Sequence, residues 1–192
     1  FINCDINNHE EVKLIFSKKK FYAVIHLAAI VGDPACKLYS ELAIKTNWDS
    51  SKELLEISKN FEVQKFIFAS TCSNYGKMDD SNLYLDENSR LAPVSLYAEL
   101  KVNFEKYLLN EMKKEENFYP IILRFSTVYG LSPRMRFDLT VNEFTKELAL
   151  GRELVVFGEQ FWRPYCHVKD FSRAFLKVLN SPNDKVAFNV FN

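Results

Sequence analysis

Three side chains in the middle of the sequence have the types and spacing of an acid–base site. Tyr97 and Lys101 are four residues apart, so a helix places both on one face, one turn apart. A free tyrosine hydroxyl has a pKa of about 10, and a neighbouring ammonium favours the phenolate and lowers that pKa. Thr71, on a separate segment, offers a hydroxyl to the same substrate oxygen. The three residues predict interconversion of an alcohol and a ketone, although Tyr-x-x-x-Lys alone is more typical of an ordinary surface pair on an amphipathic helix.

The composition is that of one globular domain with a core. The 192 residues are 47% hydrophobic and 26% charged, with 25 basic and 25 acidic side chains. No basic run indicates nucleic acid, and the apolar runs are too short to span a membrane. The four cysteines are dispersed without a C-x-x-C pair, which suits reduced thiols in a cytoplasmic protein better than a zinc site or a disulfide framework.

Strand-like and helix-like segments alternate along the chain. Strands are expected at residues 1–5, 21–29, 63–69, 121–126, 154–157 and 186–192. Helices are expected at 9–20, 37–59, 137–150, 168–179 and in the segment that Ser95 opens as N-cap and that carries Tyr97. This alternation predicts an α/β fold of the Rossmann-like type, a doubly wound parallel sheet with helices on both faces.

Polar residues follow three of the expected strands. Asp33 follows the second strand, residues 70–73 follow the third, and Thr127 follows the fourth. Ligands of such sheets bind beyond the carboxyl ends of the strands. The shared placement of these residues predicts a binding site at that edge.

Several motifs in a fixed order cover nearly the whole chain. They are Asp5-Ile6, VIHLAA at 24–29, Asn47 with the helix after it, FIFASTCSNYG at 66–76, Tyr97 with Lys101, LRFSTVYG at 123–130 and RPYCHVKD at 163–170. The set resembles the extended short-chain dehydrogenase/reductases, specifically the NAD-dependent epimerase/dehydratase family that acts on nucleotide sugars. The resemblance implies NAD or NADP as cofactor, a nucleotide-sugar substrate, no metal and a homodimer formed through two helices.

The resemblance also implies a role for each motif residue. Tyr97 is the acid/base, Lys101 binds the nicotinamide ribose and lowers the Tyr97 pKa, and Thr71 orients the substrate hydroxyl. The implied cofactor-binding residues are Asp5, Ile6, Leu27, Ala28, Ala29, Asn47, Ala69, Ser70, Tyr97 and Lys101. The implied substrate-binding residues are Cys72, Ser73, Thr127, Arg136 and Arg163. Two alternatives remain open: Asp5 as a turn residue, and Asn47 as a tie between backbone segments.

Two departures from the family pattern qualify this expectation. None of the five glycines forms the Gly-x-x-Gly-x-x-Gly turn that receives the cofactor pyrophosphate. We therefore expect an N-terminally incomplete NAD(P)-binding domain with the catalytic residues at 1–130, and at 131–192 a mixed segment that contributes to a small C-terminal substrate lobe and to the last Rossmann elements. Cys72 and Ser73 stand where sugar 4,6-dehydratases carry Asp-Glu, which disfavours dehydration.

The expected function is therefore NAD(P)-dependent epimerisation or oxidoreduction of a nucleotide sugar. The alternative is a truncated, catalytically silent relative that binds a nucleotide sugar or a partner subunit. A sugar 4,6-dehydratase is the less favoured third reading.

Overall fold

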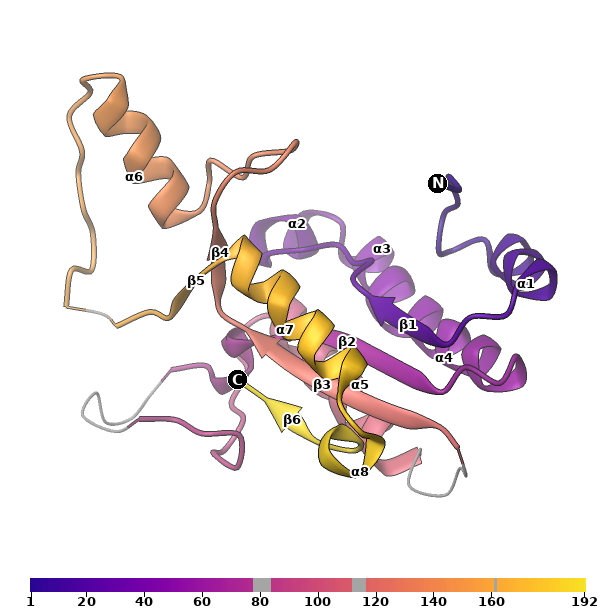
Figure 1. The fold of residues 1–192 in the computed structure, drawn as a ribbon. Helices are drawn as coiled ribbons and strands as arrows, with labels where there is room; N and C mark the ends of the chain where they lie inside the picture. The colour runs from indigo at the N-terminus through magenta and orange to yellow at the C-terminus, as the bar shows by residue number, and fades with distance from the viewer. Residues whose placement is uncertain (78–83, 112–116, 161) are drawn as a thin grey trace.

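The computed structural model describes residues 1–77, 84–111, 117–160 and 162–192. Its centre is a four-stranded sheet in the order β1 (Ala23–His26), β2 (Lys65–Thr71), β3 (Tyr119–Phe125) and β6 (Val190–Phe191), with every neighbouring pair parallel (Figure 1). Ile67 of β2 lies opposite Ile25 of β1 and Ile121 of β3. The predicted parallel sheet is confirmed.

Side chains of β2 alternate between the two faces of the sheet, as the period of a strand requires. Phe66 and Phe68 pack with Leu55 and Phe104 on one face. Ile67 packs on the opposite face, together with Ile121, Leu123, Val178 and Val186. Both faces are covered, which explains why β2 reads as a nearly continuous apolar run rather than an alternating one.

Helices cover both faces of the sheet. The first face carries α4 (Ser50–Asn60) and α5 (Leu96–Glu111), with α1 (His9–Lys18) packed on α4 through Phe16 and Ile57. The second face carries α7 (Val168–Asn180) and α8 (Asn183–Val186), and Figure 1 shows α7 crossing the sheet. The apolar stripe of α5 faces the core, because Leu100, Phe104 and Leu108 are all buried.

The helix expected at 37–59 is instead four elements. These are α2 (Asp33–Leu38), α3 (Ser40–Ile44), the π-helical turn η1 (Lys45–Asp49) and α4. The break falls at Tyr39, whose φ of −119° and ψ of 52° are not helical. The wide turn at η1 buries Thr46 and Asn47, whose side chains make hydrogen bonds to other segments. Such π turns are often found at functional sites.

Two of the expected strands do not form. Residues 1–5 lie outside the sheet, and residues 154–157 are extended without a paired strand in the part of the chain that is described. Phe1, Ile2, Val155, Val156 and Phe157 are exposed. An apolar, β-branched segment forms a strand only where a neighbouring strand accepts its hydrogen bonds, and neither segment has one.

Other boundaries differ from the predicted ones. The strand expected at 21–29 is limited to β1 at an edge of the sheet, where Ile25 is 39% exposed. Within 186–192 the strand is limited to β6, since α8 extends to Val186, although Phe188 and Asn189 also make backbone hydrogen bonds to β3. The helix expected at 137–150 is α6 (Thr140–Ala149). A second parallel pair, β4 (Thr127–Tyr129) with β5 (Tyr165–His167), was not predicted.

Candidate active site

The candidate site lies where β2 ends and α5 begins. Thr71 is the last residue of β2 and the N-cap of the 3-10 turn η2 (Cys72–Tyr75). Its Oγ1 accepts a hydrogen bond of 3.2 Å from Ser73 N. Among the described residues the Thr71 hydroxyl only accepts a hydrogen bond, so its proton can be donated to a ligand. Ser95 caps α5 by accepting from Ala98 N at 3.3 Å, as predicted, and its hydroxyl donates to Asp33 Oδ1 at 2.6 Å.

Tyr97, in the first turn of α5, packs beside Cys36 and Leu100. Burial, followed by the nearby Cys36, Cys72 and Asp33, raises the pKa of Tyr97 to about 12, while the charge of Arg136 acts in the opposite direction. The pKa of Tyr97 is therefore raised overall, in contrast to the expected lowering. The phenol is protonated near neutral pH and is a proton donor.

Lys101 lies one turn further along the same face of α5 and is 5% exposed. Its Nζ donates to Ala69 O at 2.7 Å and lies 4.4 Å from the ring centroid of Phe68 and 5.9 Å from that of Tyr97. Burial lowers the pKa of Lys101 to about 8, although the charge of Glu105 raises it. The ammonium is therefore bonded to the backbone of β2 near its carboxyl end.

Residues expected to bind the cofactor meet at the same edge. Leu27 and Ala28 follow β1 and are exposed, and Ala29 is half-buried. Ala69 and Ser70 belong to the neighbouring strand β2, so the parallel pairing brings the two groups together.

Asn47 and Asp5 both make local hydrogen bonds of the kind that their alternative interpretations predict. Asn47 accepts from Ile30 N at 2.8 Å and donates to Ile30 O at 2.9 Å, so its amide ties η1 to the loop after β1. Asp5 is exposed, and its Oδ1 accepts from the backbone and side-chain nitrogens of Asn7 at 2.9 Å, so Asp5 is a turn residue before α1. Ile6 is half-buried in that turn.

The residues expected to bind substrate come from three segments, of which two, those of Cys72 and Arg136, lie close enough to Tyr97 to affect its pKa. Cys72 is half-buried and begins η2 with Ser73, and burial raises the pKa of its thiol against the charge of Arg163. Thr127 opens β4 and donates from its backbone to Pro164 O at 3.1 Å, which places it beside the Arg163 segment.

Arg136 is a second cation near the site, in addition to Arg163. It is held by Asp138 through two hydrogen bonds of 2.7 and 2.6 Å, and its charge reaches Tyr97.

Sequence reasoning missed a buried polar network beside the site. Arg124 holds both carboxylate oxygens of Glu105, with a shortest contact of 2.8 Å, and Asn74 donates to Glu105 Oε1 at 2.7 Å. Arg124 lies within the LRFSTVYG motif, and Glu105 follows Lys101 at helical spacing on the same face. That spacing was the available signal.

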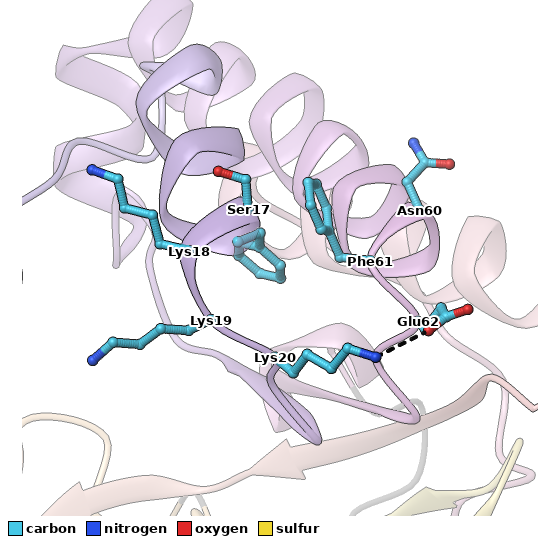
Figure 2. A pocket seen from close by; sticks show the side chains of 8 residues that line it. Ser17, Lys18, Lys19, Lys20, Asn60, Phe61 and Glu62 are labelled. Atoms are coloured by element: carbon cyan, nitrogen blue, oxygen red, sulfur yellow. Dashed lines mark ion pairs between the residues drawn. The ribbon is translucent and has the colours of Figure 1, made fainter.

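A surface cavity of about 280 Å³ lies away from this site. Figure 2 shows it between the ends of α1 and α4, on the side where the sheet strands begin. Its lining residues are Phe16, Ser17, Lys18, Lys19, Lys20, Asn60, Phe61 and Glu62. Lys20 Nζ lies 3.9 Å from Glu62 Oε2.

Among the described side chains no three His, Cys, Asp or Glu residues could hold a metal ion. No helix within the described ranges is long and apolar enough to cross a membrane.

A Rossmann-like sheet with Thr, Tyr and Lys at its carboxyl edge defines the class of the extended short-chain dehydrogenase/reductases. The comparison with family models agrees, since the model described as the NAD dependent epimerase/dehydratase family matches residues 1–192. The chain belongs to that family.

Several relatives carry the names of nucleotide-sugar enzymes. The chain is 30% identical over 173 residues to the "Uncharacterized UDP-glucose epimerase YtcB" of Bacillus subtilis, covering 83% of this chain and 49% of that protein. It is similar to the structure of UDP-glucose 4-epimerase with UDP-glucose from Thermotoga maritima, with a TM-score of 0.82, 30% identity, and coverage of 95% and 59%. The Thermus thermophilus UDP-glucose 4-epimerase complex with NAD gives a TM-score of 0.80, 25% identity, and coverage of 94% and 60%. The chain thus spans about half to three-fifths of these proteins.

Proposed function

We propose that this chain carries the catalytic residues of an NAD(P)-dependent epimerase or oxidoreductase acting on a nucleotide sugar. The observation that carries the proposal is the convergence of Thr71, Tyr97 and Lys101 at the carboxyl edge of the sheet, in a member of this family. Residues 1–130 would bind the cofactor and hold the catalytic groups, and residues 131–192 would contribute to the substrate side.

The residues at the edge fit a nicotinamide cofactor. Lys101 is a buried ammonium whose described partner is one carbonyl, so it can still donate to ribose hydroxyls. Leu27 and Ala28 offer an exposed apolar wall beside it, with Ala69 and Ser70 on the next strand, and Asp5 and Ile6 would lie toward the adenine. NAD, when bound, supplies the acceptor and donor of the hydride at the sugar carbon.

Tyr97 and Thr71 would handle the proton of the reacting hydroxyl. Thr71 donates its hydroxyl proton to the substrate oxygen and so holds that oxygen near Tyr97, while Tyr97 transfers a proton to or from it. Because burial raises the pKa of Tyr97 to about 12, the tyrosinate depends on positive charge at the site, which Lys101 and Arg136 provide. Such general acid–base transfer contributes about 10²–10⁴-fold in rate.

Two arginines would bind the diphosphate of the substrate. Arg163 and Arg136 approach the site from separate segments, and a guanidinium suits phosphate oxygens because it donates two parallel hydrogen bonds. Cys72, Ser73 and Thr127 would contact the sugar. Neither Cys72 nor Ser73 is a carboxylic acid, which favours epimerisation over dehydration. The relatives named as UDP-glucose epimerases suggest a UDP-hexose as the first substrate to test.

The test is conversion of UDP-glucose to UDP-galactose by the full-length protein with NAD, followed by proton NMR, with other UDP- and dTDP-sugars in parallel. We expect an epimer to form and the Tyr97→Phe variant to be slower by at least about 10²-fold, with an unchanged melting temperature. Full activity in that variant contradicts the role of Tyr97. Tight nucleotide-sugar binding without NAD binding or turnover supports instead a catalytically silent binding protein.

A further inference from the structure

We propose that Asn74 and Glu105 are positioning residues that fix Thr71 against Tyr97 and Lys101. The inference rests on the proposed function and adds to it two residues outside the expected site. Neither residue would touch the substrate, and both would act through the segments that carry the catalytic groups.

Asn74 closes the turn that follows Thr71. Its side chain is fully buried, and Nδ2 donates to Ser70 Oγ at 3.0 Å and to Glu105 Oε1 at 2.7 Å. The backbone carbonyl of Asn74 also accepts from Ala92 N at 3.0 Å. The residue before Thr71 and the turn after it are thereby joined through one amide, which leaves Thr71 little freedom to move.

Glu105 connects this turn to the helix of the acid/base. It lies four residues after Lys101 and eight after Tyr97, on the same face of α5, and is 1% exposed. Arg124 of β3 donates to its carboxylate from Nε at 3.2 and 3.1 Å and from Nη2 at 2.8 Å. A series of hydrogen bonds therefore runs from Ser70, the residue before Thr71, through Asn74 to Glu105, which lies on the face of α5 that carries Tyr97 and Lys101.

The same network also holds the loop that crosses η2. Arg124 Nη1 donates to Tyr75 Oη at 2.9 Å and to Glu87 O at 3.0 Å. The guanidinium therefore bonds to α5, to η2 and to the loop at once, so the positions of these three segments are all fixed relative to β3.

This network is a poor device for stability alone. A buried ion pair often contributes no more than well-packed apolar side chains of the same volume. Asn74 Oδ1 has no hydrogen-bond partner among the described atoms, and such a buried group costs about 1–3 kcal/mol. The network does fix the relative orientation of β2, β3 and α5, because its hydrogen bonds join all three and each bond has a preferred geometry.

The experiment compares Asn74→Ala and Asn74→Ser with Lys65→Met in the full-length protein. Lys65 is a matched control because it is equally buried and its Nζ donates to three carbonyls, but it lies at the opposite end of β2. A displacement of about 1 Å between reacting groups costs about 10²-fold in rate. We therefore expect kcat of both Asn74 variants to fall by about 10–100-fold, with KM for the sugar and Kd for NAD within about threefold of wild type.

We expect Lys65→Met to lower the melting temperature and to leave kcat unchanged. If the Asn74 variants lose stability as Lys65→Met does but keep wild-type kcat, the network is only structural and the inference is overturned. Asn74→Ser is included because its hydroxyl supplies a hydrogen-bond donor and fills more of the site than alanine, should Asn74→Ala fail to fold. Tyr97→Phe in the same assay separates the two proposals: an active Tyr97→Phe protein removes the proposed function, whereas an inactive one beside fully active Asn74 variants removes only the positioning role.

Discussion

At the scale of single residues, the protonation of the site is decided by burial, which shifts the pKa values of its two ionisable side chains. Tyr97 and Lys101 share a face of α5, yet burial raises the pKa of the first and lowers that of the second. Both shifts favour the neutral side chains in this structure. The acid–base function proposed for Tyr97 therefore depends on the positive charges that Lys101 and Arg136 keep beside it.

Replacing Lys101 by methionine should stabilise the fold while abolishing turnover. The pKa of Lys101 falls from 10.5 to about 8, so burying its charge lowers the free energy of unfolding by on the order of 3 kcal/mol. The methionine variant avoids this cost but loses the hydrogen bond to Ala69 O, which contributes about 1 kcal/mol. We expect the free energy of unfolding at pH 7, measured in urea, to rise by about 2 kcal/mol.

The pH dependence of Lys101→Met provides its control. Because the pKa of Lys101 is lower in the folded chain, the unfolded chain binds more protons above pH 8, and the wild type gains stability as pH rises from about 8 toward 10.5. The advantage of the variant should therefore shrink over that range. A variant less stable than wild type at pH 7 contradicts this account of the buried ammonium.

His26 should make the fold sensitive to acid. It is buried against Phe66 and Phe68, its Nε2 lies 2.8 Å from Ser51 Oγ, and burial, followed by the charge of Lys101, lowers its pKa to about 3. The unfolded chain alone takes up this proton between pH 6.5 and 3, so stability falls as pH decreases. From pH 6.5 to 5 we expect the wild type to lose about 2 kcal/mol more than His26→Gln in urea unfolding. Equal losses in the two proteins would show that His26 is not the group responsible.

At the scale of the elements, the turn η2 is positioned by a close crossing of the chain. Gly76 ends the turn with φ of +69°, and a Cβ added there would lie 1.7 Å from Ala92 O. Because this contact is with backbone, the loop or the turn must move to admit a side chain. The crossing therefore holds the turn that carries Cys72, Ser73 and Asn74.

Gly76→Ala should destabilise the protein by more than about 3 kcal/mol and reduce turnover through displacement of η2. Gly151→Ala is the matched control, since its φ is +66° but nothing lies within 4 Å of the added Cβ, so only the backbone cost of about 1–2 kcal/mol applies. Both values follow from urea unfolding. Similar losses for the two variants would show that the crossing at Ala92 is not tight.

The elements also show how far the sequence could predict the structure. Local patterns were sufficient for β2, α5 and the N-cap at Ser95, because their apolar periodicity and capping residue are decided within a few positions. They failed at residues 154–157, where a strand-like composition has no neighbouring strand. They failed also at the expected helix of 37–59, where the hydrogen bonds of Asn47 to Ile30 accompany a π turn.

The candidate site was predictable in its location but not in its electrostatics. The ends of parallel strands place Thr71, Tyr97 and Lys101 at one edge, and this follows from order along the chain. The direction of the Lys101 ammonium and the pairing of Glu105 with Arg124 depend on contacts between segments distant in sequence. Spacing along one helix cannot specify such contacts.

At the scale of the whole molecule, the chain divides into a well-packed sheet and a peripheral arm. Helices bury both faces of β2 and β3, whereas Figure 1 shows α6 standing away from the sheet. None of the residues of α6 is buried, and Leu148 is 62% exposed.

Hydrogen exchange on the 192-residue chain should separate these two parts. Amides of α6 open locally, so we expect them to exchange at least about 10³-fold faster than the central amides of β2 and β3, which open only with the whole fold. Mass spectrometry of peptides from both regions gives the comparison. Equal protection of α6 and β2 would mean that α6 is packed more closely than the structure shows.

The central claim is that Tyr97 moves the proton that accompanies hydride transfer, and single-turnover reduction of bound NAD tests it most directly. The full-length protein is mixed with NAD and UDP-glucose, and the absorbance of reduced nicotinamide is followed in the wild type and in Tyr97→Phe. We expect a transient rise in the wild type and a rise slower by at least about 10²-fold in the variant, with NAD binding unchanged. Equal rates of reduction in the two proteins would contradict the account.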